Sequence, residues 1–310
     1  MAGGRDISTP LWTRTGGLSI AASAVLAVIY LNQPFDDDIE RLIFVGCLLA
    51  NAAVAFLTGL YLQPRVRELF DLLETDTTGT EARARIFGDW RGVAFGLLFG
   101  LTIAFVGTRF STDGPALPWA FALLTAVNVI IGFALYAIVR YWILIHRAMA
   151  AKPFRILALS RPDLTVFMLI NGMITFGAAG ISCLAVLSLR FSPLELGTIA
   201  PVFSVFSVLI VVASYCVPLF QLGNRLHMEK RREMMRIETM VVALTDTLDG
   251  RNDAEKQAEL KALLAFRDAI AAVKTFPPNG EFSFSATVTA VVVSFIPVLL
   301  ERFIPGVFGG

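Results

Sequence analysis

Residues 118–145 read PWAFALLTAVNVIIGFALYAIVRYWILI, and this run decides the fold class. Its single charged residue, Arg140, lies near its end. A helix that crosses a bilayer needs about 20 predominantly apolar residues, so the run is long enough to be a transmembrane helix. The rest of the chain agrees, because 56% of the 310 residues are hydrophobic and only 16% are charged, whereas soluble domains carry about 25% charged residues. The sequence therefore predicts an all-α, polytopic membrane helical bundle.

Seven apolar runs are predicted to span the membrane. They are Gly17–Leu31, Leu42–Leu62, Gly92–Thr108, Pro118–Ile145, Leu164–Leu189, Ile199–Phe220 and Phe282–Leu300. The first run is short and follows Arg5 and Arg14, as the core of a signal peptide would. Because no small-residue cleavage site follows it, we predict a signal anchor that is retained, although a cleaved first segment is the alternative.

The charges in the loops predict the orientation of the chain. Lys and Arg are abundant in the second, fourth and sixth loops and scarce in the first, third and fifth. Loops rich in Lys and Arg stay in the cytoplasm. We therefore predict a multi-pass protein of the plasma (inner) membrane, with a cytoplasmic N-terminus and an outer C-terminus. The four tryptophans each lie at an end of a run and are predicted to sit at headgroup level: Trp12, Trp90, Trp119 and Trp142.

The sixth loop is the one substantial segment outside the predicted spans. It carries a heptad seam, which favours a coiled coil, made of Met234, Ile237, Val241, Leu244 and Leu248. A turn follows, and then a second apolar stripe made of Leu263, Phe266, Ile270 and Val273. We predict a cytoplasmic antiparallel helical hairpin over residues 221–280, between a bundle of six spans (1–220) and a seventh span with a short outer C-terminus (281–310). The two stripes cover each other, or the first meets its copy in a homo-oligomer.

Several small and polar residues lie inside the runs. Gly92, Gly96 and Gly100 have the small-xxx-small spacing that lets two helices approach closely. Polar residues away from the run ends are Asn51, Asn128, Asn171, Ser204, Ser207, Ser214, Ser283, Thr287 and Ser294. Two interpretations stay open for them. They form helix–helix and local hydrogen bonds, or they line a polar path or pocket.

The sequence favours a membrane protein that is not an enzyme. It contains no Walker, H-E-x-x-H or G-x-S-x-G motif. We therefore expect no catalytic site, cofactor or metal site, and a net charge of +1 predicts no nucleic-acid partner. No charged residue lies near the middle of any run, which disfavours ion-coupled pumps.

Two functional classes remain, and their partners differ beyond the lipid bilayer. One is an oligomeric ion channel or channel-like sensor. The other is a non-conducting scaffold or signalling protein whose hairpin binds a cytoplasmic partner, with a small-molecule permease as a further alternative. Seven spans, a cytoplasmic N-terminus, a long sixth helix and a short outer C-terminus resemble insect chemoreceptor channels in outline, without a shared residue motif. The resemblance implies a channel.

Overall fold

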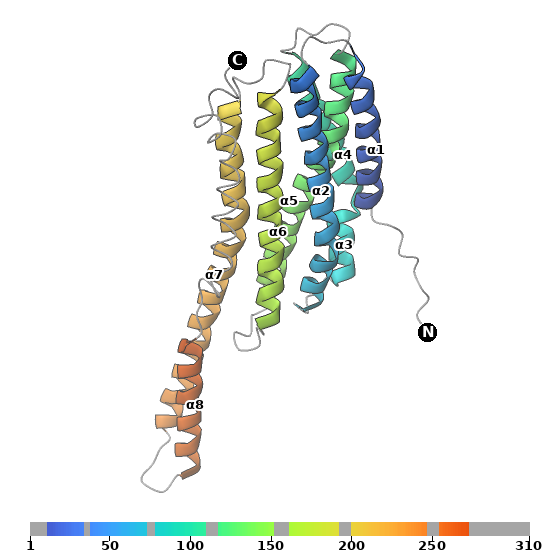
Figure 1. Ribbon diagram of the computed structural model, residues 1–310. Coiled ribbons are helices and arrows are strands. Elements are labelled where there is room, and N and C mark those ends of the chain that lie inside the picture. The colour runs from blue at the N-terminus through green and yellow to red at the C-terminus, as the bar shows by residue number, and fades with distance from the viewer. Residues whose placement is uncertain are drawn as a thin grey trace, which may run out of the picture.

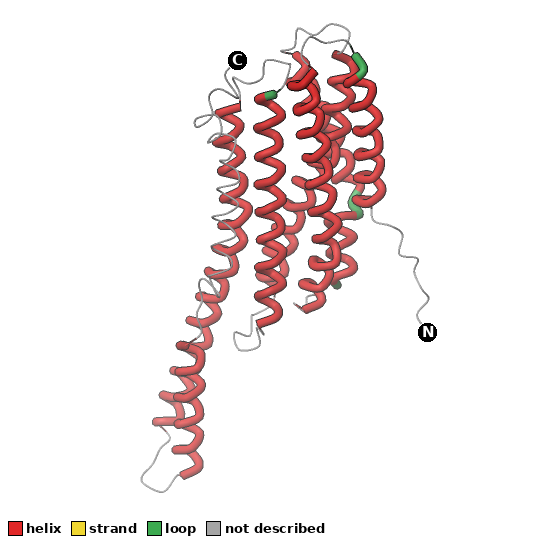
Figure 2. Tube along the Cα trace, viewed as in Figure 1, coloured by secondary structure: helices red, strands yellow, loops and turns green. Residues whose placement is uncertain are grey.

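The computed structural model describes residues 11–33, 38–72, 78–109, 117–151, 161–191, 200–246 and 254–272. In this part of the chain every regular element is a helix (Figure 2). Six of the described helical segments are long and apolar enough to cross a membrane, so the chain is a multi-pass membrane protein. They correspond to the first six predicted spans. The predicted seventh span, Phe282–Leu300, lies outside the described residues.

Eight helices make up the described structure. They are α1 (Leu11–Leu31), α2 (Asp38–Leu72), α3 (Gly79–Phe87), α4 (Trp90–Arg109), α5 (Leu117–Ala151), α6 (Arg161–Arg190), α7 (Ala200–Asp246) and α8 (Ala254–Ala272). Several helices extend beyond the predicted runs. The first span begins at Leu11 and is therefore long enough to cross a bilayer, and α5 continues past Ile145 to Ala151, so His146 and Arg147 are helical.

The bundle is built around α5. This helix packs against α1, α2, α3 and α4, whereas α6 packs against α2 on one side and α7 on the other. Figure 1 shows the long helices side by side, with α7 at one edge. The tight contacts of α5 include Phe133, whose ring lies edge-on to the indole of Trp12 with centroids 4.9 Å apart. The core thus extends from α1 across α5.

A buried arginine joins α1 to α2. Arg41 of α2 donates from Nη1 to the Gln33 carbonyl at 2.6 Å and from Nη2 to the Leu31 carbonyl at 2.8 Å. The last carbonyls of a helix have no partner within the helix. Arg41 therefore caps the end of α1 and holds the start of α2 against it.

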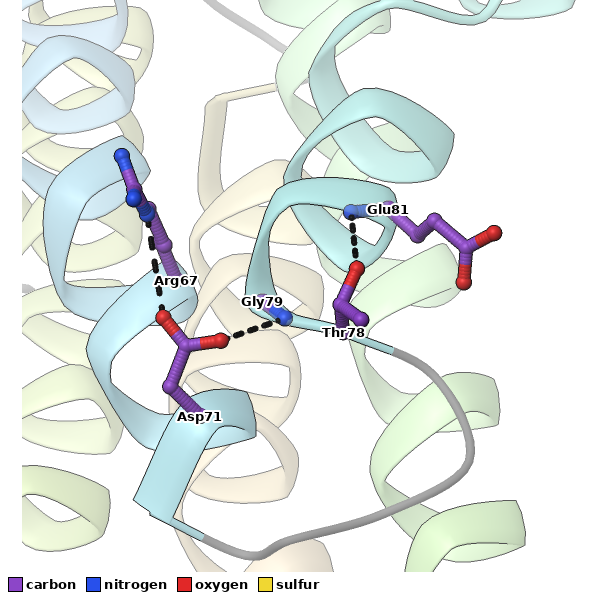
Figure 3. Close-up of polar contacts among 5 residues, drawn as sticks. All are labelled: Arg67, Asp71, Thr78, Gly79 and Glu81. Atoms are coloured by element: carbon purple, nitrogen blue, oxygen red, sulfur yellow. Dashed lines mark hydrogen bonds and ion pairs between the residues drawn. The ribbon is translucent and has the colours of Figure 1, made fainter. Parts of the chain in front are cut away.

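The short helix α3 was not predicted from the sequence. Its N-cap is Thr78, whose hydroxyl accepts a hydrogen bond from the Glu81 N–H at 3.3 Å (Figure 3). Asp71 at the end of α2 accepts from the Gly79 N–H at 2.8 Å and pairs with Arg67 at 3.7 Å (Figure 3). Thr78 and Glu81 have the spacing of a capping box, which was the available sequence signal.

The helix α7 leaves the bundle and pairs with α8. At 1.5 Å per residue, its 47 residues extend about 70 Å. Figure 1 shows α8 beside the far end of α7, and the Lys230 ammonium donates to the Ala271 carbonyl at 2.6 Å. Ile237 of α7 and Ile270 of α8 are both buried. We call these two paired segments the α7–α8 hairpin.

The other predicted seam residues of the hairpin vary in burial. Met234, Val241, Leu244 and Leu263 are half-buried, and Phe266 is exposed. Leu248 and Val273 lie outside the described residues. Ile237 and Ile270 are therefore the two predicted seam residues that are fully buried in the described part of the hairpin.

Candidate functional site

The three glycines of α4 face α5. All three are buried, and each would place an added Cβ against α5. At Gly100 this atom would lie 2.7 Å from the Thr125 carbonyl oxygen, and at Gly96 it would lie closer still to the Val129 carbonyl oxygen. The backbones of α4 and α5 therefore approach so closely that only hydrogen fits between them, which is a packing role.

The three asparagines are buried in different helices and have different partners. Asn51 lies on α2, Asn128 on α5 and Asn171 on α6. Asn128 donates from Nδ2 to the Leu124 carbonyl of its own helix at 2.8 Å. In the described part of the chain, Asn51 Oδ1 and both amide atoms of Asn171 have no hydrogen-bond partner. A buried polar atom without a hydrogen bond lowers the stability of the folded state by about 1–3 kcal/mol, so these amides are destabilising at their positions.

The asparagines do not form one cluster. Antiparallel α2 and α6 touch where Gly177 meets Thr58 and Gly180 meets Val54. On α6, Asn171 lies six residues before Gly177, and on α2, Pro64 lies six residues after Thr58. Asn171 is therefore level with Gln63 and Pro64. Asn51 lies twelve residues before Gln63, or about 18 Å away along α2. The amides therefore occupy two levels of the bundle.

The predicted hydroxyl face lies mostly beyond the described side chains. Ser214 is buried on α7. Ser204 and Ser207 belong to the same helix, but their side chains are outside the description. Ser283, Thr287 and Ser294 lie outside the described residues. A pore lining by these hydroxyls stays a prediction.

A cavity of about 40 Å³ lies inside the bundle and was not anticipated from the sequence. Residues of α1, α2, α3, α5 and α6 line it, and most of them are apolar. Two polar groups in the lining are fully buried, namely the Trp12 indole and the Tyr141 phenol. Neither Trp12 Nε1 nor the Tyr141 hydroxyl has a hydrogen-bond partner among the described residues. The cavity therefore combines apolar walls with two unpaired polar atoms and the half-buried side chain of Thr58.

The ring of Trp12 faces the interior of the bundle, and its depth in the membrane stays a prediction. Its ring is fully buried against Phe87 and Phe133, and a Cβ added at Gly59 would collide with it. By contrast, Trp90 is 67% exposed, as expected for an interfacial residue. Position near the end of an apolar run does not distinguish these two environments, because α1 begins earlier than the run.

The helix α6 separates the cavity from α7. Ile174, Gly177 and Ala178 of α6 line the cavity. Ala178 also packs against the small buried cluster formed by Ala179 of α6 and Val211 of α7. A displacement of α6 at this level would therefore reach α7 directly.

A polar contact closes the α3–α4 junction beside α5. The Asp89 carboxylate accepts a hydrogen bond from the Tyr136 hydroxyl at 2.5 Å and another from the Arg91 N–H at 3.0 Å. Asp89 thus caps the start of α4 and ties it to α5. Within the described ranges, no group of three or more His, Cys, Asp or Glu side chains is arranged to hold a metal ion.

Comparisons with protein-family models, with curated proteins and with solved structures each find no match to this chain.

Proposed function

We propose that this chain is a multi-pass membrane sensor or signalling protein, in which α7 transmits conformational changes of the bundle to a helical hairpin in the cytoplasm. One observation carries the proposal. The helix α7 is a single element of 47 residues that packs on α6 within the bundle and on α8 beyond it. Because α7 is continuous from the bundle to the hairpin, a shift or rotation at α6 displaces the hairpin.

Pro218 supplies a place where α7 can bend. It lies inside the helix and has no N–H to donate to the Ser214 carbonyl one turn before it. Kinks in helices concentrate at such positions. The contact between Ala179 and Val211 lies on the bundle side of Pro218, and the hairpin lies on the other side. Motion at α6 thus reaches the hairpin through this point.

The hairpin exposes an apolar surface that is suited to contact with a partner. Met228, Met235 and Val242 are all exposed and follow one another by seven residues, so they share one face of α7. The buried contact with α8 uses Ile237 instead. We propose that this exposed apolar face contacts a cytoplasmic protein or a second copy of the chain.

The loop charges support a cytoplasmic location for the hairpin. Figure 1 shows that α1 begins on the side toward which α7 extends, which agrees with a cytoplasmic N-terminus and a cytoplasmic hairpin. A reporter enzyme fused after Asp249 should be active in the cytoplasm, and one fused after Arg190 should be active outside. An outer location for the Asp249 fusion would refute the orientation.

Distance measurements between spin labels test the coupling. Labels at Glu68 on α2 and Ala258 on α8, in a chain with its three cysteines replaced by serine, report the position of the hairpin relative to the bundle. Ala179→Leu should change this distance, because the larger side chain wedges α6 from α7. Ala21→Leu on the exposed face of α1 is the control and should not. An unchanged distance in folded Ala179→Leu would contradict transmission through α7.

A channel is the second candidate, and the unpaired amides favour it. Asn51, Gln63 and Asn171 each carry a buried polar atom without a partner among the described residues. Such groups occur where water or an ion passes. Reconstituted protein that conducts ions or small solutes, with conduction reduced by Asn171→Leu, would favour this candidate over a non-conducting sensor.

A further inference from the structure

The cavity has the chemistry of a site for one hydrogen-bond acceptor. Trp12 Nε1 can only donate a hydrogen bond, and the Tyr141 hydroxyl can donate or accept one. Both belong to side chains that are at least 98% buried and that line the cavity. Leaving a buried donor without an acceptor costs about 1–3 kcal/mol. A group that accepts from both side chains would recover this cost.

The size and walls of the cavity narrow the occupant further. Its volume of about 40 Å³ exceeds the roughly 10–15 Å³ that one water needs and falls well below the roughly 150 Å³ that accommodates benzene. Among the described residues no charged side chain lines the cavity, so an ion would lose its hydration without gaining a counter-charge. The occupant must be small, neutral and compatible with apolar walls.

We propose that this cavity binds a small neutral molecule through one acceptor oxygen, held between Trp12 Nε1 and the Tyr141 hydroxyl. A water molecule and the hydroxyl of a short alcohol share this chemistry. The oxygen accepts from the indole N–H. Its own O–H donates to the phenol oxygen, or its second lone pair accepts from the phenol O–H. The remaining atoms contact the apolar walls formed by residues such as Ala137 and Ile174.

A molecule bound in the cavity would displace α7 through α6. This effect of binding rests on the proposed function. Ala178 lines the cavity and also packs against the Ala179–Val211 contact between α6 and α7. A bound molecule therefore presses on the wall whose far side carries the long helix. Binding itself needs only the cavity and its two polar groups.

Nuclear magnetic resonance of the tryptophan indoles tests the binding. The full chain, labelled with ¹⁵N at its four indoles and held in detergent micelles, gives a Trp12 signal that Trp12→Phe identifies. We expect this N–H to exchange magnetisation with a long-lived water, or to shift saturably as ethanol is added. The first result identifies water as the occupant and the second an alcohol. If the Trp12 N–H shows neither of these two responses, the proposal is overturned.

Filled variants provide the matched control. Ala137→Val adds two methyl groups to the cavity wall and should abolish the response of Trp12, whereas Ala21→Val on the exposed face of α1 should preserve it. Ala178→Val repeats the test if Ala137→Val does not fold. Tyr141→Phe removes one hydrogen bond and should weaken a response to ethanol about fivefold. A response that survives in the folded, filled variants would place the molecule elsewhere and overturn the proposal.

The same variants separate this proposal from the proposed function. If Trp12 binds the small molecule but the distance between labels at Glu68 and Ala258 does not change with occupancy, the site stands and the coupling fails. If Ala179→Leu moves the hairpin but Trp12 shows no bound molecule, the coupling stands and the site fails.

Discussion

Replacing Gly100 by alanine tests the close approach of α4 and α5. An added Cβ would lie 2.7 Å from the Thr125 carbonyl oxygen and 3.2 Å from the Val129 nitrogen, both in the backbone of α5. Ordinary contact begins at 3.4 Å. The two helices must therefore separate by about 0.7 Å at this point, because backbone atoms cannot rotate away as a flexible side chain can.

The magnitude follows from two opposing terms. Overpacking a fitted interface costs about 1–3 kcal/mol, while alanine is favoured over glycine within a helix by about 0.8–1.0 kcal/mol. Gly17→Ala isolates the second term, since a Cβ at Gly17 meets nothing within 4 Å. Gly17→Ala should raise the free energy of unfolding of the protein. The free energy of unfolding of Gly100→Ala should be about 1–3 kcal/mol lower than that of Gly17→Ala. Gly96→Ala should be at least as unfavourable as Gly100→Ala.

The assay is unfolding in mixed detergent micelles with an increasing fraction of sodium dodecyl sulfate, followed by circular dichroism. All variants are compared under one set of conditions, so that the difference between Gly100→Ala and Gly17→Ala contains only the steric term. If both variants unfold at the same detergent fraction, the close contact between α4 and α5 does not contribute to stability, and the reasoning from small-xxx-small spacing is wrong for this helix pair.

Three further substitutions test caps and the hairpin. Arg41→Ala removes two charged hydrogen bonds, to the Leu31 carbonyl at the end of α1 and to the Gln33 carbonyl just after it, and should lower the unfolding free energy by about 1.5–3 kcal/mol, with only partial recovery in Arg41→Lys. Thr78→Ala should lower the stability of α3 by about 1 kcal/mol, seen as faster amide exchange there, whereas Thr80→Ala, without the capping contact, should change it less. Ile237→Asp places a carboxylate in the α7–α8 contact and should speed amide exchange throughout α8, whereas Met235→Asp on the exposed face should not.

The helices of the bundle could be predicted from the sequence because lipid leaves few alternatives. Every backbone polar group within hydrocarbon must be paired inside the protein, so a long apolar run folds as a helix. The run from Leu42 to Leu62 is an example, and it forms the first part of α2. The antiparallel packing of α8 on α7 also agrees with the two apolar stripes, since Ile237 of the first stripe and Ile270 of the second are both buried.

The helix ends were harder to predict because polar residues form them. Apolar periodicity does not register the polar first turns of α1, so the run starting at Gly17 concealed a helix that begins at Leu11. The helix α3 is short and carries three charged residues, and its evidence in the sequence is the cap from Thr78 to Glu81. Local hydrogen bonds, rather than hydrophobicity, determine these boundaries.

The cavity depends on distances that no single segment of sequence contains. Trp12 and Tyr141 are far apart in the chain, and the contact of α1 with α5 brings them to one space. The sequence places both residues near the ends of apolar runs, where aromatic side chains commonly face lipid headgroups. Whether such a ring turns toward the headgroups or the interior depends on whether a neighbouring helix leaves room for it. Here Gly59 of α2 leaves that room, since even one added carbon at this position would overlap the Trp12 ring. The indole that Gly59 admits has no acceptor for its N–H among the described residues, so the polar character of the cavity depends on how α1, α2 and α5 pack.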